Sequence, residues 1–168
     1  MPYAKLRNDI LAARDRRQKD LEQLTSTGSR ATLVLLSLNL PGPQKAAASF
    51  WRLFDWGAQQ LRCHIEDLEP VTRQTDVLGP WALYTSDLSA AAAKQVGCTI
   101  EESCAAARLL DIDVYDNNAV AYHRQQLGHP PRPCFVCPAA ASECIRLGRH
   151  SSQELQRYLE RLLNHLPA

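Results

Sequence analysis

The feature that most constrains the fold is the apolar run ATLVLLSLNL at residues 31–40, which ends at Pro41–Gly42–Pro43. It is rich in branched apolar residues and is bounded by a turn, which favours a buried strand. The run is far too short to span a bilayer. Because the chain has 168 residues, it is long enough to bury a substantial core in one domain.

The spacing of apolar residues predicts the other elements. Helices are expected over residues 3–24, from 44 to about 65, after a cap at Ser86 and after a cap at Ser151. Strands are expected at residues 71–75, 81–85, 108–116 and 119–125. The sequence therefore predicts one α+β domain over residues 1–168, with a mixed sheet, flanking helices, a C-terminal Cys/His subdomain and a final helix.

The charge balance argues against two classes of partner. Lys and Arg total 19 and Asp and Glu total 18, which gives a net charge of +1. This balance argues against bulk electrostatic binding to nucleic acid or to a membrane surface. The first twenty residues carry charge where a signal peptide needs an apolar core, so a cytoplasmic location is expected. Six cysteines are then expected to be reduced thiols or metal ligands.

The segment RLLDIDVYDNN at residues 108–118 carries paired carboxylates. Alternation along a strand places Asp111 and Asp113 on one face. Such a pair can hold Mg²⁺ for phosphoryl or nucleotidyl transfer, because carboxylate oxygens are hard ligands and the metal neutralises phosphate charge. The alternative is that one aspartate pairs with Arg108 or Arg124 while the other faces water.

Two further segments could contact phosphate. In LNLPGPQK, residues 38–45, Lys45 follows a strand and a rigid turn near a helix start, although prolines donate no N–H group. The alternative is a purely structural turn. A basic cluster could grip a polyphosphate, or could simply be a solvated face; its members are Arg124, His129, Arg132, Arg146, Arg149 and His150.

A cysteine cluster lies near the C-terminus. Cys134, Cys137, Cys144 and His150 form a set of four ligands that would suit tetrahedral Zn²⁺. The alternative is a small subdomain with reduced cysteines, in which His150 binds an anion or acts in catalysis.

These motifs, in their order and spacing, resemble one family: the citrate lyase holo-acyl-carrier-protein synthases, also called apo-citrate lyase phosphoribosyl-dephospho-CoA transferases. The segments that carry the resemblance are AARDRRQKDLEQL, LVLLSLNLPGPQK, FDWGAQQLR, RLLDIDVYD and RPCFVCPAAASECIRLGRH.

The resemblance implies a reaction. A serine of the apo-acyl-carrier subunit of citrate lyase attacks triphosphoribosyl-dephospho-CoA, and pyrophosphate leaves. In that reaction Asp111 and Asp113 would hold Mg²⁺, and either could help to deprotonate the serine. Lys45, Arg108 and Arg124 would offset charge on the pyrophosphate, with Arg132, Arg149 and His150 as further candidates.

One segment departs from the family pattern. Cys104, Ala105, Ala106 and Ala107 stand where the family usually has His-Pro-x-Gly. A thiol is a poor replacement for imidazole in proton transfer, and the alanines are expected to extend the preceding helix. Two alternatives therefore stand beside the transferase: a catalytically impaired, zinc-containing module that binds the carrier protein, and a nucleotidyltransferase acting on another acceptor.

Overall fold

The apolar run forms strand β1 (Thr32–Leu38), which is buried along its whole length. In this computed structural model, Leu33 and Leu35 join an apolar cluster on one face of the sheet. The alternate residues from Val34 to Leu38 join a larger cluster on the other face. Because successive side chains point to opposite faces, a strand that is apolar throughout is suited to the centre of a sheet covered on both sides. The structure describes residues 2–26, 30–41 and 48–165.

Five strands form one sheet in the order β2-β3-β1-β4-β5. The outer four are β2 (Glu69–Asp76), β3 (Gly79–Ser86), β4 (Leu110–Asp116) and β5 (Ala121–Tyr122). Every pairing is antiparallel, so the expectation of a mixed sheet is wrong in this respect. The reason lies in the connections: the helical segments after β1 and after β3 each return the chain past one intervening strand, so parallel strands are never neighbours.

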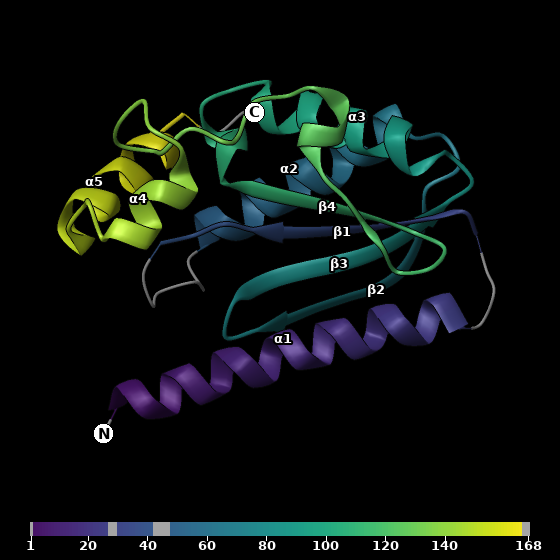
Figure 1. Cartoon of the computed structure of the whole chain (residues 1–168), viewed down its shortest axis with the longest axis horizontal. Coiled ribbons are helices and arrows are strands. Elements are labelled where there is room, and N and C mark those ends of the chain that lie inside the picture. The colour runs from purple at the N-terminus through teal and green to yellow at the C-terminus, as the bar shows by residue number, and fades with distance from the viewer. Residues whose placement is uncertain (1, 27–29, 42–47, 166–168) are drawn as a thin grey trace.

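Helices cover both faces of the sheet, which confirms the α+β class (Figure 1). One face carries α2 (Ala48–His64) and α3 (Ala90–Glu102), and α1 (Pro2–Ser26) lies along the other. A Cβ atom on Gly97 of α3 would lie only 2.9 Å from Cγ2 of Ile112 in β4. This close approach brings the charged side chains of α3 within reach of β4.

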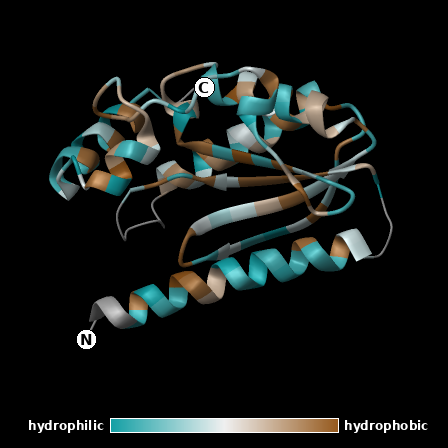
Figure 2. Ribbon diagram, viewed as in Figure 1, coloured by the Kyte–Doolittle hydropathy of each residue, from teal (hydrophilic) through white to brown (hydrophobic). Residues whose placement is uncertain are grey.

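Helix α1 contacts the sheet through few apolar residues. Ala13 and Leu21 are buried, whereas much of the rest of the helix is hydrophilic (Figure 2). Arg17 forms two 2.9 Å nitrogen-to-oxygen hydrogen bonds with Asp76, and its guanidinium lies 5.2 Å from the ring centre of Trp81. These contacts join α1 to the turn between β2 and β3.

Two local expectations were wrong. Ser86 does not cap α3; its hydroxyl donates to Asp67, and Ser89 is the capping residue. The alanines after Cys104 do not extend α3, which ends at Glu102, because the chain must turn there to enter β4. They begin the short 3₁₀ helix η1 (Ala106–Leu109), whose first two residues are fully buried.

The C-terminal part contains a Cys/His segment and a final helix, as the sequence predicts. A 3₁₀ turn η2 (Arg124–Leu127) leads to α4 (Ala141–Leu147) and then to α5 (Ser152–Leu163). Ser151 caps α5 in a reciprocal capping box with Glu154. Among the residues described above, no helix has the length and apolar character needed to cross a membrane.

Candidate active site and candidate metal centre

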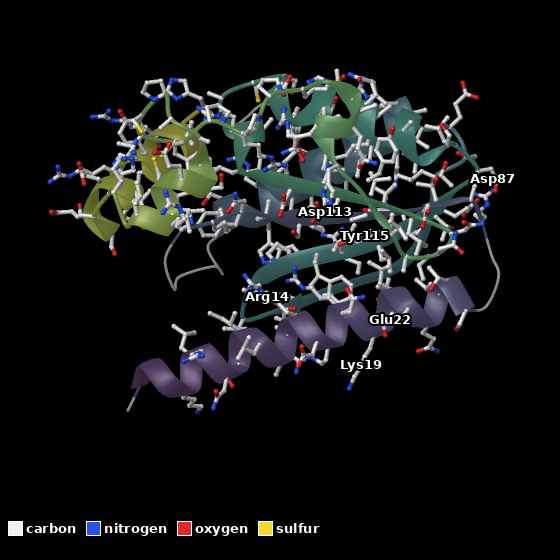
Figure 3. The ribbon with its side chains drawn as sticks, viewed as in Figure 1. Arg14, Lys19, Glu22, Asp87, Asp113 and Tyr115 are labelled. Carbon is white, nitrogen blue, oxygen red and sulfur yellow. The ribbon has the colours of Figure 1, made fainter. Side chains whose placement is uncertain are left out.

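Asp111 and Asp113 point to the same face of the sheet, because burial alternates along β4. Their side chains are 38% and 46% exposed, whereas the apolar residues that alternate with them are buried. Figure 3 shows Asp113 and Tyr115 on the side of β4 that faces α1. The arrangement therefore leaves both carboxylates accessible.

The aspartates open into a cleft between α1 and the sheet, which we call the α1 cleft and whose volume is about 380 Å³. Arg14 points from α1 toward the sheet, whereas Lys19 points outward (Figure 3). The cleft is therefore lined by positive as well as negative groups. The lining residues that matter here are Arg14, Arg17, Ser37, Asn39, Asp111 and Asp113.

Desolvation and nearby negative charge raise the pKa values of two side chains of β4. The pKa of Asp113 is raised, first because the surrounding protein partly desolvates its carboxylate and second because Asp111 lies beside it, while Lys94 and Arg132 oppose the shift. The same two aspartates add to burial in raising the pKa of Tyr115 to about 12. Asp113 thus ionises less readily than an ordinary aspartate, which makes a nearby cation favourable.

Arg132 is the arginine that the structure places beside the aspartate pair. Its guanidinium lies 3.3 Å from Oδ1 of Asp111, pairs with Glu101 and donates to the carbonyl of Leu110 at 3.1 Å. Burial raises the pKa of Glu101, against the opposing effect of Arg132. Neither Arg108 nor Arg124, the two partners considered from the sequence, pairs with an aspartate of β4 among the described residues.

Arg108 and Arg124 line a second hollow of about 650 Å³, which we call the arginine hollow and which Arg132 also lines. Arg124 pairs with Glu101 and Glu102. Arg108 donates to the carbonyl oxygens of Pro133 and Cys134, both at 3.1 Å. Asn39, at the end of β1, lines both this hollow and the α1 cleft, so the two spaces adjoin.

Two predicted phosphate ligands are not found beside the aspartates among the described residues. Lys45 lies outside the described residues. Arg149 is not beside the aspartates; its guanidinium pairs with Glu143 at 2.9 Å, next to the cysteine cluster. The structure therefore brings Arg132 to the aspartate pair and leaves Arg149 with the candidate metal centre.

The four predicted metal ligands come together. The ligand atoms of Cys134, Cys137, Cys144 and His150 all lie within 4.8 Å of one another, and the sulfurs of Cys137 and Cys144 are 3.5 Å apart. Nε2 of His150 is buried and has no hydrogen-bond partner within the described part of the chain. Three thiols and one imidazole nitrogen form a donor set that Zn²⁺ accepts, and the imidazole nitrogen lacks another partner. The cluster could therefore hold such a metal.

The thiols of the cluster are electrostatically unequal. The pKa of Cys137 is lowered to about 6, mainly because the backbone at Ala139 hydrogen-bonds to its sulfur, with further help from Cys144 and His150. Burial raises the pKa of Cys144 to about 11. The metal would replace these sulfur–sulfur contacts by bonds to thiolate.

Sequence reasoning missed Lys94 and Glu101. Both are buried charged residues of α3, with 6% and 3% exposure, and they face β4. In the sequence, Leu88, Ala92, Val96 and Ile100 repeat at helical spacing and predict an apolar stripe. In the structure, however, the buried face of α3 runs through Ala93 and Gly97. An apolar stripe shifted by one residue along the helix would have placed Lys94 and Glu101, which are seven residues apart, on the side that faces the core.

Cys104, the first residue of the segment that departs from the family pattern, lines the arginine hollow together with Arg108. Ala119 is the only non-glycine residue with a positive φ in the described ranges, so the alanines at 105–107 have ordinary backbone conformations. The turn into β4 therefore forms here without a glycine.

Together these features define an α+β protein that presents paired carboxylates and arginines to adjoining hollows, with a Cys₃His cluster beside them. Carboxylates that can bind a metal ion and arginines that can contact phosphate oxygens together suit the binding of phosphate esters. The chain belongs to the apo-citrate lyase phosphoribosyl-dephospho-CoA transferase family, whose family model matches residues 6–166. The resemblance seen in the sequence is thus confirmed, and the chain is a member of a transferase family.

Named relatives agree with this assignment. Protein CitXG of Leuconostoc mesenteroides subsp. cremoris is 31% identical over 160 residues, which cover 93% of this chain and 34% of that protein. This chain therefore spans about a third of that relative's length. A probable apo-citrate lyase phosphoribosyl-dephospho-CoA transferase of Streptococcus pyogenes serotype M18 is 29% identical, with 94% and 84% covered. Its counterpart from Escherichia coli O139:H28 is 27% identical, with 95% and 89% covered.

Proposed function

We propose that this chain transfers the phosphoribosyl-dephospho-CoA group to a serine of the apo-acyl-carrier subunit of citrate lyase. The proposed donor is triphosphoribosyl-dephospho-CoA, and residues 1–168 act as one transferase domain. Family membership supports the reaction class. The structural observation that carries the proposal is the pair of accessible aspartates at the α1 cleft.

Mg²⁺ is the proposed cofactor of the aspartate pair. The residues fit it: both ligands are carboxylates, both face one cleft, and the pKa of Asp113 is raised first by desolvation and then by the charge of Asp111. Asp111 and Asp113 would hold the ion. When bound, it would neutralise charge on the triphosphate of the donor.

The remaining steps fall to the side chains of the protein. The serine oxygen forms a bond to the phosphorus nearest the ribose, the bond from that phosphorus to the pyrophosphate oxygen breaks, and a phosphodiester results. Either aspartate is a candidate to accept the serine proton, because both carboxylates line the cleft that the serine would enter. The transferred proton can then leave to solvent through the open cleft.

Arginines would stabilise the departing pyrophosphate. Arg132 and Arg14 line the two hollows that adjoin the aspartates, and Arg108 and Arg124 extend this positive wall. Arginine can contact two phosphate oxygens at once, which suits a polyphosphate. Lys45 is a further proposed ligand of the donor's phosphates.

Zn²⁺ is the proposed structural metal of the Cys/His cluster. The orphaned Nε2 of His150 and the three clustered thiols support it. A metal here would fix the segment around Cys134, whose carbonyl accepts a hydrogen bond from Arg108. The free cysteines also support a reducing, cytoplasmic location as part of the proposal.

A direct experiment tests the function. The protein is incubated with apo-carrier, triphosphoribosyl-dephospho-CoA and Mg²⁺, and the carrier is analysed by intact mass while pyrophosphate is measured. We expect one attached group per carrier and one pyrophosphate released. Magnesium is withheld rather than chelated in the control, so that zinc is not removed. Carrier binding without attachment would instead support the non-catalytic alternative, which the family assignment does not favour.

A further inference from the structure

Half of strand β4 lies at an open edge of the sheet. Strand β5 pairs with β4 only at Val114 and Tyr115. Between Leu110 and Asp113, no other described strand lies on the outer side of β4. The backbone N–H and C=O groups on that side need other partners, because an unpaired buried group is costly.

Charged side chains take the place of the missing strand. The backbone N–H of Ile112, which lies between the two aspartates, donates to Oε1 of Glu101 at 2.8 Å. Nζ of Lys94 donates to the carbonyl of the same residue at 2.5 Å. Arg132 donates to the carbonyl of Leu110 at 3.1 Å. All three contacts are made on the outer edge of the strand that carries Asp111 and Asp113.

The same side chains reach the carboxylates. Nζ of Lys94 lies 4.0 Å from Oδ1 of Asp113. Arg132 is shared between Glu101 and Asp111. Burying a lysine and a glutamate is expensive, and apolar residues would stabilise a core at lower cost. Their positions thus indicate a role beyond stability.

We propose that Lys94 and Glu101 are positioning residues that hold the aspartate strand and set the charge around its two carboxylates. This role rests on the proposed function. Glu101 fixes the strand through Ile112 and draws Arg132 partly away from Asp111, which leaves that carboxylate available to a metal ion. Lys94 fixes the carbonyl of the same residue and places its ammonium near the carboxylate of Asp113.

Two isosteric or near-isosteric variants test this role. Glu101→Gln keeps an oxygen that can accept from Ile112 but loses the charge that holds Arg132. Lys94→Met keeps the buried chain length but loses the ammonium. The matched controls are Glu160→Gln on the exposed side of α5 and Lys19→Met on the outer side of α1. Circular dichroism confirms that each variant is folded.

The decisive readout is the Mg²⁺ concentration that gives half-maximal transfer. We expect it to rise roughly 10–100-fold in Glu101→Gln, the usual size of an effect on residues that support metal ligands. In Lys94→Met the same concentration should also rise, because the carbonyl of Ile112 loses its donor and the strand that carries both aspartates is held less firmly. A merely structural role would leave this concentration unchanged in folded protein.

Amide hydrogen exchange separates this inference from the proposed function. In the wild-type protein the N–H of Ile112 should exchange slowly although no strand pairs with it. In Glu101→Gln it should exchange faster, because a neutral amide oxygen accepts a weaker hydrogen bond than a carboxylate. If the wild type fails to transfer but shows this protection and binds Mg²⁺ through Asp111 and Asp113, the function fails and the positioning role stands. Wild-type metal dependence and wild-type Ile112 exchange in both variants would overturn the positioning role.

Discussion

The aspartate pair and the Cys/His cluster are built in opposite ways. The ligands of the cluster lie within residues 134–150, and their atoms lie within 4.8 Å of one another. The aspartates are held by side chains from distant segments, namely Lys94 and Glu101 of α3 and Arg132. The first site is defined by local spacing, and the second by the packing of α3 against β4.

The two sites also differ in openness. The aspartates face a cleft, and their side chains are 38% and 46% exposed, whereas Cys134 and Cys144 are buried. An exposed site with unbalanced charge suits a ligand that enters and leaves. A buried sulfur-rich site suits a resident structural metal. The difference therefore agrees with the proposal of one site for chemistry and one site for structural support.

The largest expected effect is the loss of transfer when the exposed aspartate pair is changed. Asp111→Asn and Asp113→Asn should each lower the rate of transfer by at least about 100-fold, because each removes a charge needed for metal and phosphate. Intact mass of the carrier measures the rate. Asp87→Asn is the control, since Asp87 is 65% exposed and lies away from the cleft (Figure 3). Full activity in both aspartate variants would contradict the proposal that the aspartate pair, unlike the Cys/His cluster, is a site for chemistry.

Next in size is the loss of the proposed structural metal. The purified protein should contain one equivalent of zinc, and Cys134→Ser should lose it, with Tm lower by roughly 10 °C. Elemental analysis and a thermal melt measure these. The control is Cys63→Ser, which replaces an exposed thiol outside the cluster. A zinc-free wild type, isolated after growth with added zinc, would contradict the proposed centre.

The sequence predicted the parts of both sites that depend on local pattern. Alternation in β4 correctly predicts that Asp111 and Asp113 share a face, and ligand spacing correctly predicts the Cys/His cluster. The apolar run correctly predicts a buried β1. Each of these depends on periodicity within one element or on a short spacing.

The sequence could not predict what depends on long-range packing. The sheet is antiparallel because parallel strands are always separated by another strand. No local sequence pattern predicts this strand order. Lys94 and Glu101 look like ordinary helix charges until α3 is placed against the edge of β4. Likewise, the partner of Asp111 is Arg132 rather than Arg108, although Arg108 is nearer in sequence.

A smaller effect is expected where the two sites meet. Arg108 belongs to η1, and its guanidinium donates to the carbonyls of Pro133 and Cys134 in the segment of the cluster. Arg108→Ala should lower transfer about tenfold, because hydrogen bonds from a charged donor are worth roughly 1.5–3 kcal/mol. Zinc content should stay at one equivalent. Loss of zinc in this variant would show instead that the two sites are not separable.

The smallest effect concerns stability, and it has the opposite sign to the effect on activity. The folded pKa of Asp113 lies above its ordinary value of 3.8, so ionised Asp113 opposes folding at neutral pH. The penalty is fully present above the raised pKa and vanishes below the ordinary value. Because the side chain is 46% exposed, solvent screens it, and Asp113→Asn should raise Tm at pH 7 by only about 1–2 °C.

A neighbouring aspartate provides the matched contrast for this prediction. Oδ1 of Asp116 accepts the backbone N–H groups of Asn118 and Val120, at 2.9 and 2.8 Å, so Asp116→Ala should lower Tm. Thermal melts at pH 7 and near pH 3.5 compare the two variants with the wild type. The gain from Asp113→Asn should shrink at the lower pH, because Asp113 is then largely protonated in the wild type. A gain independent of pH would mean that packing, and not the charge of the open site, causes it.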